Sequence, residues 1–265
     1  MNNTIIKSIW TSTWPTTVIM AWVHGNEKAG IIALDELLGP DFEIEKGVVY
    51  FIYANIQAME KNVRCVEKNM NRCFIKNWLW TTYEEKRAQE IIWYLEQADY
   101  LLDIHNTTNQ YNSVPMLISE YPELGEYFNV EYIVSWFDTL HPWGSDGYMN
   151  TIGKKWLCIE CGNIYDNNWS KLAKESIINF LRYTGNISWT LARYTKQVYI
   201  QFTEIYKNKT NAFRFEKEFR DMEKIAKWTL IGYDDTEEIR AWYDGYILFS
   251  SKPKKIGDEC FVLWK

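Results

Sequence analysis

The stretch "TTVIMAWVHGNEKAG" (16–30) joins an apolar run to a histidine, a glutamate and the start of a helical pattern. Its first part is β-branched or apolar almost throughout, as expected of a strand that is buried on both faces of a sheet. Apolar residues then recur at helical spacing as far as Gly39, and we expect Asn26 to cap this helix. The stretch therefore predicts a strand, a turn that holds His24 and Glu27, and a helix.

The same alternation of buried strands and helices continues along the chain and predicts an α/β fold, with a mainly parallel or mixed sheet flanked by helices. After about residue 188 it gives way to short strands separated by turn residues, which predicts a small all-β domain. We therefore expect a catalytic domain at 1–188 and a β-rich domain at 189–265. The other strands and helices expected in the first domain lie at 47–55, 82–98, 100–105, 131–137, 154–162 and 167–185.

The composition excludes several classes of partner. The chain has 265 residues, 47% of them hydrophobic, and a net charge of −6 with acidic and basic residues interspersed. It has no basic stripe, so we expect neither nucleic acid nor a membrane as a partner. The first residues lack the pattern of a signal peptide, and the five cysteines are scattered, so we expect a cytoplasmic protein with reduced thiols. Cys158 and Cys161 would face opposite sides of a strand, which argues against a CxxC site.

Two of the three histidines lie where a predicted strand ends. His24 and His105 should meet at one edge of the sheet, because parallel strands end together there, and Glu27 is close enough to His24 to share an ion. Two histidines and one carboxylate, with a fourth position open for water, are typical of catalytic zinc. The alternative is that Glu27 only favours a helix N-terminus. We interpret His141 as a loop or packing histidine.

Further candidates for chemistry lie in two other places. Glu160 ends a buried strand, where a carboxylate is costly unless it has a partner or a function; the alternative is a core glutamate neutralised by an arginine. The segment that follows the second strand supplies Arg64, Asn71 and Arg72. Such arginines are usually solvated surface charges, but near a metal they become candidates for polarising a carbonyl and binding a carboxylate.

Taken in order along the chain, four motifs resemble the succinylglutamate desuccinylase/aspartoacylase family, relatives of the zinc carboxypeptidases. The C-terminal stretch "LIGYDDTEEIRAWYDGYILF" (230–249) is similar to the small β-domain of that family. The four motifs are "HGNE" (24–27), "ANIQAMEKNVR…NMNRCF" (54–64 and 69–74), "DIHNTT" (103–108) and "IECG" (159–162).

The resemblance implies a zinc-dependent hydrolase that cleaves the amide bond of a small N-acyl amino acid, with one Zn²⁺ per chain. It implies that Glu160 is the general base and acid, that Arg64 polarises the carbonyl, and that Asn71 and Arg72 bind a substrate carboxylate. The positions that match the family's zinc ligands are His24, Glu27 and His105.

The chain also departs from the family pattern. Ile56 stands where the family usually has proline, and Asn69 replaces the aspartate of an Asp-x-Asn-Arg motif, which removes a negative charge beside Asn71 and Arg72. We expect these departures to leave the metal chemistry intact. A zinc carboxypeptidase-like peptidase and a non-catalytic zinc-binding protein remain as alternatives. The acyl group, the amino acid, the role of the β-rich domain and the formation of a homo-oligomer stay open.

Overall fold

The chain forms two compact units in the computed structural model. The first runs as far as Thr107 and from Pro115 to Val198, and the second consists mainly of Tyr199–Lys265. The predicted domain boundary at residue 188 lies ten residues before this division and stays a prediction. The structure describes residues 5–9, 12, 14–76, 79–107, 114–135, 143–166, 168–188, 190, 191 and 193–265.

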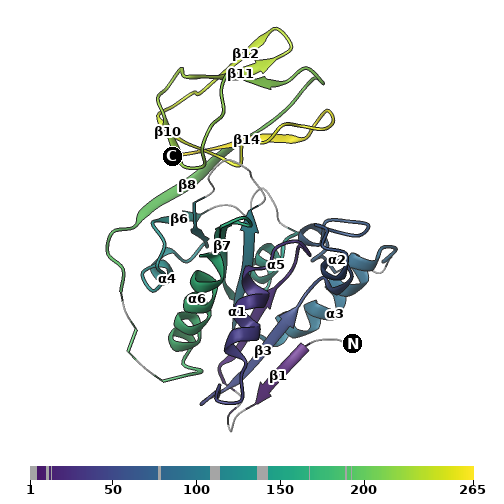
Figure 1. Cartoon of the computed structure of the whole chain (residues 1–265), viewed down its shortest axis with the longest axis vertical. Helices are drawn as coiled ribbons and strands as arrows, with labels where there is room; N and C mark the ends of the chain where they lie inside the picture. The colour runs from purple at the N-terminus through teal and green to yellow at the C-terminus, as the bar shows by residue number, and fades with distance from the viewer. Residues whose placement is uncertain are drawn as a thin grey trace. The chain divides into compact units, whose positions relative to one another are not determined.

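The first unit is built on a mixed sheet, as predicted (Figure 1). Its centre is parallel: β3, β2, β4 and β7 run in one direction, whereas β1 pairs antiparallel with β3 and β5 pairs antiparallel with β7. In spatial order the strands are β1 (Ile5–Ile9), β3 (Val48–Tyr53), β2 (Thr16–Ala21), β4 (Tyr100–Thr107), β7 (Lys155–Asn163), β5 (Met116–Ile118) and β6 (Tyr132–Ser135).

Helices cover both faces of this sheet. Neighbouring residues of β3 point to opposite faces: Phe51 belongs to the core that α1 and α6 share, whereas the ring of Tyr50 lies 5.0 Å from that of Tyr94 in α3. The helices are α1 (Ala29–Leu37), α2 (Ile56–Glu60), α3 (Tyr83–Gln97), α4 (Pro122–Gly125), α5 (Ser145–Thr151) and α6 (Trp169–Thr184), with a 3₁₀ turn η1 (Met70–Arg72).

The ends of the helices can be compared with the caps and stops that the sequence predicted. Thr82 and Glu85 form the expected capping box, and Gly185 ends α6 in the left-handed conformation with φ 78°. The predicted cap at Asn26 is wrong, because α1 begins only at Ala29. Residues 24–27 form a separate turn, and the side chain of Asn106 in β4 accepts a hydrogen bond from the first N–H of the helix at 2.8 Å.

The second unit is all β, as predicted. Its two antiparallel sheets have the strand orders β8-β14-β13-β10 and β12-β11-β9. Phe219, Ile231 and Phe261 lie in its core. Its strands are β8 (Val198–Lys207), β9 (Arg214–Phe215), β10 (Glu223–Ile225), β11 (Leu230–Asp234), β12 (Glu237–Arg240), β13 (Gly245–Leu248) and β14 (Glu259–Trp264).

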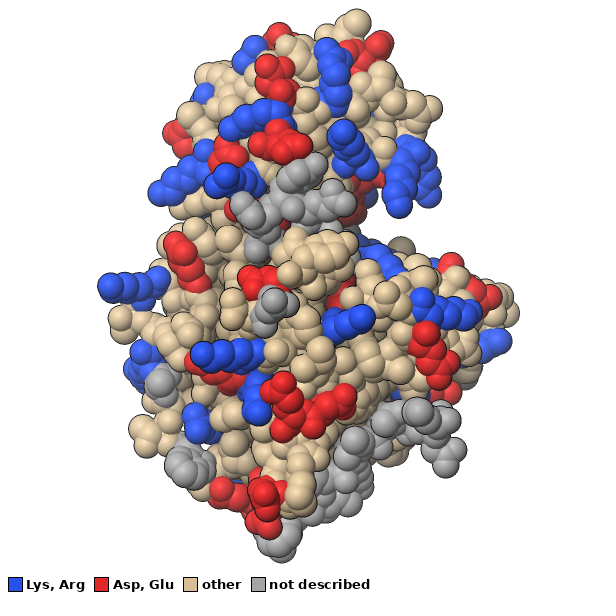
Figure 2. Space-filling view, viewed as in Figure 1, with Lys and Arg blue, Asp and Glu red and all other residues tan. Residues whose placement is uncertain are grey.

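The face shown in Figure 2 agrees with the charge pattern of the sequence. Figure 2 shows basic and acidic side chains interspersed over the face that it presents, with no extended basic patch among the described residues. Within the described part of the chain, no helix combines the length and the apolar character that crossing a bilayer requires.

Candidate metal centre

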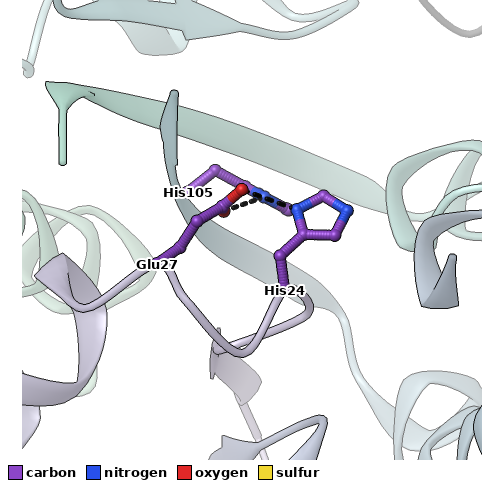
Figure 3. Close-up of side chains that lie close together, drawn as sticks. All are labelled: His24, Glu27 and His105. Carbon is purple, nitrogen blue, oxygen red and sulfur yellow. Dashed lines mark hydrogen bonds and ion pairs between the residues drawn. The ribbon is translucent and has the colours of Figure 1, made fainter. Parts of the chain in front are cut away.

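His24, Glu27 and His105 come together in a buried cluster in the first unit (Figure 3). The Glu27 carboxylate lies between the two imidazoles: Oε1 is 2.7 Å from Nδ1 of His24, and Oε2 is 2.9 Å from Nδ1 of His105. One potential ligand atom from each residue lies within 4.8 Å of the others. The structure thus brings together the three residues that the sequence pattern had singled out.

The fold explains this convergence. Parallel strands β2 and β4 are neighbours and end at the same edge, so the turn after β2 carries His24 and Glu27 to His105 in β4. Gly25 allows this turn to lie against α2, since a Cβ atom at this position would stand 2.1 Å from the carbonyl carbon of Ala58. The site is therefore assembled mainly by the strands and by one tightly packed turn.

Burial and charge set the protonation of these groups. Burial alone would raise the pKa of Glu27, but His24 and His105 outweigh it and lower this pKa, which keeps the carboxylate ionised. Burial lowers the pKa of His24, although Glu27 opposes this effect. Burial would also lower the pKa of His105, but Asp103 and Glu27 raise it well above the usual value.

The donor set fits a divalent metal. Both imidazoles direct Nδ1 toward the Glu27 carboxylate, and both outer nitrogens contact other groups. His24 Nε2 lies 3.0 Å from Oδ1 of Asn69, and His105 Nε2 lies 3.2 Å from Oδ2 of Asp103. The contact with Asn69 is a hydrogen bond, whereas His105 Nε2 makes no hydrogen bond with a described residue and its contact with Asp103 is an ion pair. Outer partners of these kinds orient the histidines of metal sites. Two nitrogens and one carboxylate oxygen are the donor types of a catalytic zinc site.

Glu160 lies on the strand next to His105. The two residues are register partners in the parallel pair β4–β7. Oε2 of Glu160 is buried and has no hydrogen-bond partner among the described residues. Burial raises the pKa of this carboxyl to about 7; His105 opposes the shift and Glu27 adds to it. A carboxyl group poised near neutrality and lacking a partner is suited to accept and return a proton.

Of the predicted substrate-binding residues, Arg64 contacts the cluster, whereas Asn71 and Arg72 form hydrogen bonds with other groups. Nη1 of Arg64 lies 3.2 Å from Oε1 of Glu27, and the Arg64 side chain is 47% exposed, so it borders the cluster. Asn71 instead accepts a hydrogen bond from the backbone N–H of Ser145 at 3.4 Å. Arg72 donates a hydrogen bond to the backbone oxygen of Asn71 at 2.8 Å. His141 lies outside the described residues.

Comparison with known proteins identifies the family. The sequence profile of the succinylglutamate desuccinylase/aspartoacylase catalytic domain matches residues 13–182. This region covers well over half of the chain and contains all four motifs. The chain belongs to this family.

Individual members of this family match the chain over shorter lengths. A probable aspartoacylase from Acaryochloris marina is 29% identical over 120 residues, which are 40% of this chain and 39% of the relative. An N-acyl-aromatic-L-amino acid amidohydrolase (carboxylate-forming) A from Danio rerio is 33% identical over 102 residues, 32% of this chain and 31% of the relative. The chain thus spans well under half the length of these two proteins.

A solved structure supports the fold. The succinylglutamate desuccinylase from Vibrio parahaemolyticus superposes with a TM-score of 0.79 at 15% identity, covering 98% of this chain and 85% of the other.

Sequence reasoning missed two acidic residues that support the site of this family member. Asp103 contacts the outer nitrogen of His105, and its spacing in "DIH" was the available signal. Glu84 is fully buried and accepts hydrogen bonds from the backbone N–H groups of Val66, Glu67 and Lys68. In the sequence, Glu84 looks like an ordinary acidic residue in the first turn of a helix.

Proposed function

We propose that the chain is a zinc-dependent amidohydrolase that cleaves the amide bond of an N-acyl amino acid and releases a carboxylate and a free amine. The observation that carries the proposal is the buried cluster of His24, Glu27 and His105 beside Glu160, whose Oε2 has no partner in the described part of the chain. Family membership supports the same reaction, since the relatives named above are described as acylases or amidohydrolases.

The imidazoles of His24 and His105 and the carboxylate of Glu27 would hold one zinc ion. When bound, the ion supplies a Lewis acid that makes water nucleophilic at neutral pH and polarises a carbonyl group. Without metal, the pKa of Glu160 lies at about 7. A nearby dication favours the ionised form of a carboxyl group, so Glu160 would be ready to act as a base at neutral pH.

Glu160 moves the proton in this proposal. Oε2 accepts a proton from the attacking water as the new C–O bond forms at the amide carbon. The same carboxyl group then delivers the proton to the amide nitrogen as the C–N bond breaks. Water is thereby added across the amide, and Glu160 returns to its starting state.

The segment from Arg64 to Arg72 positions the substrate. Arg64 borders the metal cluster with a half-exposed side chain, so its guanidinium can donate to the amide carbonyl as negative charge develops there. Asn71 uses Oδ1 to accept the Ser145 N–H, which leaves Nδ2 as its donor toward a substrate carboxylate. Arg72 is the cationic partner proposed for that carboxylate.

The test is release of primary amine from a panel of N-acyl amino acids and short peptides. Zinc-loaded wild type is compared with Glu160→Gln, with a chelator-treated sample, and with Glu43→Gln as a control at an exposed carboxylate of the same unit. We expect turnover of at least one acyl amino acid by wild type and Glu43→Gln. In Glu160→Gln it should fall by about 10²–10⁴-fold.

Other outcomes select the alternatives. Turnover of peptides alone would favour a carboxypeptidase-like enzyme. One tightly bound zinc ion per chain with no turnover of any panel member would favour a non-catalytic zinc-binding protein. Turnover that survives both the chelator and Glu160→Gln would refute the mechanism.

A further inference from the structure

Asn69 joins a backbone turn to a candidate metal ligand. It is the N-cap of η1, and its side-chain Oδ1 accepts a hydrogen bond from the backbone N–H of Asn71 at 3.0 Å. The same oxygen lies 3.0 Å from Nε2 of His24. One atom of Asn69 thus contacts both the segment that carries Asn71 and the imidazole of His24.

The contact with Asn71 identifies this atom as an oxygen. A backbone N–H can only donate, so the amide of Asn69 must present its carbonyl oxygen there and not its NH₂ group. An oxygen that faces His24 Nε2 at 3.0 Å requires this nitrogen to be the donor. Nε2 therefore carries the hydrogen, and a neutral His24 ring keeps its lone pair on Nδ1.

The other ring nitrogen of His24 faces the carboxylate: Nδ1 lies 2.7 Å from Oε1 of Glu27. Because Asn69 holds the hydrogen on Nε2, Nδ1 is the ring nitrogen that can share a metal with Glu27. The orientation of Asn69 thus prepares His24 to bind a metal through Nδ1.

The two histidines have different outer partners. Nε2 of His105 contacts the carboxylate of Asp103, whereas Nε2 of His24 contacts the neutral amide of Asn69. A carboxylate partner increases the basicity of a ligating imidazole more than an amide does. His24 therefore receives the weaker electrostatic support of the two.

We propose that Asn69 is a positioning residue for the metal centre: its oxygen selects the His24 tautomer that binds zinc through Nδ1, and its neutral amide holds zinc affinity below the value that a carboxylate would give. This inference rests on the proposed zinc site. It assigns to Asn69 a role toward the metal, whereas the sequence pattern had associated this position only with the substrate carboxylate.

The test measures zinc affinity by competition with a chromophoric chelator, which requires no substrate. Asn69→Ala removes the oxygen, and Asn69→Ser keeps a capping acceptor for η1 but is one bond too short to replace the amide toward His24. Asn69→Asp keeps both contacts and adds charge. Asn129→Ala, at an exposed position of the same unit, is the control.

We expect Asn69→Ala and Asn69→Ser to bind zinc about 10- to 100-fold more weakly than wild type, and Asn69→Asp to bind it more tightly. In zinc-loaded wild type, the ¹⁵N NMR signals of His24 should show hydrogen on Nε2 and metal on Nδ1. Equal affinities for wild type and Asn69→Ser, or metal on Nε2, would overturn this inference alone. A wild type that binds no zinc would overturn the proposed function as well.

Discussion

Replacing Glu84 by glutamine should loosen the segment that carries Arg64. The Glu84 carboxylate accepts hydrogen bonds from the N–H groups of Val66 at 2.6 Å, of Glu67 at 3.2 Å and of Lys68 at 3.1 Å. It belongs to α3 but holds three consecutive amides of a distant segment. No other described side chain accepts a hydrogen bond from these three groups.

The size of the effect follows from the change of one acceptor into a donor. In Glu84→Gln one oxygen becomes an NH₂ group and faces a backbone N–H, which leaves a part-buried donor without its acceptor, at about 1–3 kcal/mol. The remaining hydrogen bonds lose their charge assistance, roughly another 1 kcal/mol. We expect a loss of about 2–4 kcal/mol, equivalent to a roughly 30- to 700-fold increase in local opening.

Amide hydrogen exchange at Val66–Lys68 measures this opening directly, since exchange of protected amides reports the free energy of opening. Glu90→Gln is the matched control: it lies on the same helix, its side chain is 57% exposed, and its ion pair with Arg87 contributes at most about 1 kcal/mol. Exchange at these amides that matches wild type within twofold in Glu84→Gln would refute the reasoning.

Two further predictions concern the stability of each unit by itself. In Gly30→Ala the new Cβ would lie 2.6 Å from Cβ of Ala21, so urea unfolding should show a loss of about 1–3 kcal/mol, whereas Gly39→Ala, with open space around it, should be nearly neutral. Burial alone would raise the pKa of Asp234, but hydrogen bonds led by that from Thr210 lower it. The stability that Asp234 supplies is then complete above the unfolded-state pKa and is lost as the pH falls through the folded-state value. Asp234→Asn should therefore cost about 1–2 kcal/mol at pH 7 and little near pH 2, as measured by urea unfolding at both pH values.

Sequence patterns predicted the elements whose signals are local. The apolar run of β2, the capping box at Thr82 and the glycine at residue 185 each depend on neighbours within a few positions, and each appears where it was expected. The start of α1 was missed because its first N–H donates to the side chain of Asn106, which lies far along the chain in β4. A pairing across that distance leaves no local pattern from which to predict it.

The convergence of the candidate metal ligands was predictable for a topological reason. Neighbouring parallel strands end at the same edge, so two histidines at such positions converge whatever the sequence between them. No comparable topological rule predicts the residues that support this cluster. Glu84 and Asn69 act through backbone amides of irregular segments, where no hydrophobic period indicates which side chain satisfies which N–H.

Glu84 and Asn69 also link the residue proposed to polarise the carbonyl with the proposed metal centre. The three amides held by Glu84 lie between Arg64, which contacts Glu27, and Asn69, which contacts His24. Loosening this segment should therefore reduce turnover and zinc affinity together. The loss of affinity has an upper bound, because His24, Glu27 and His105 lie on the strands and the turn outside the segment. Zinc binding in Glu84→Gln should weaken no more than it does in Asn69→Ala, and a larger loss would mean that Glu84 also supports the strand ends themselves.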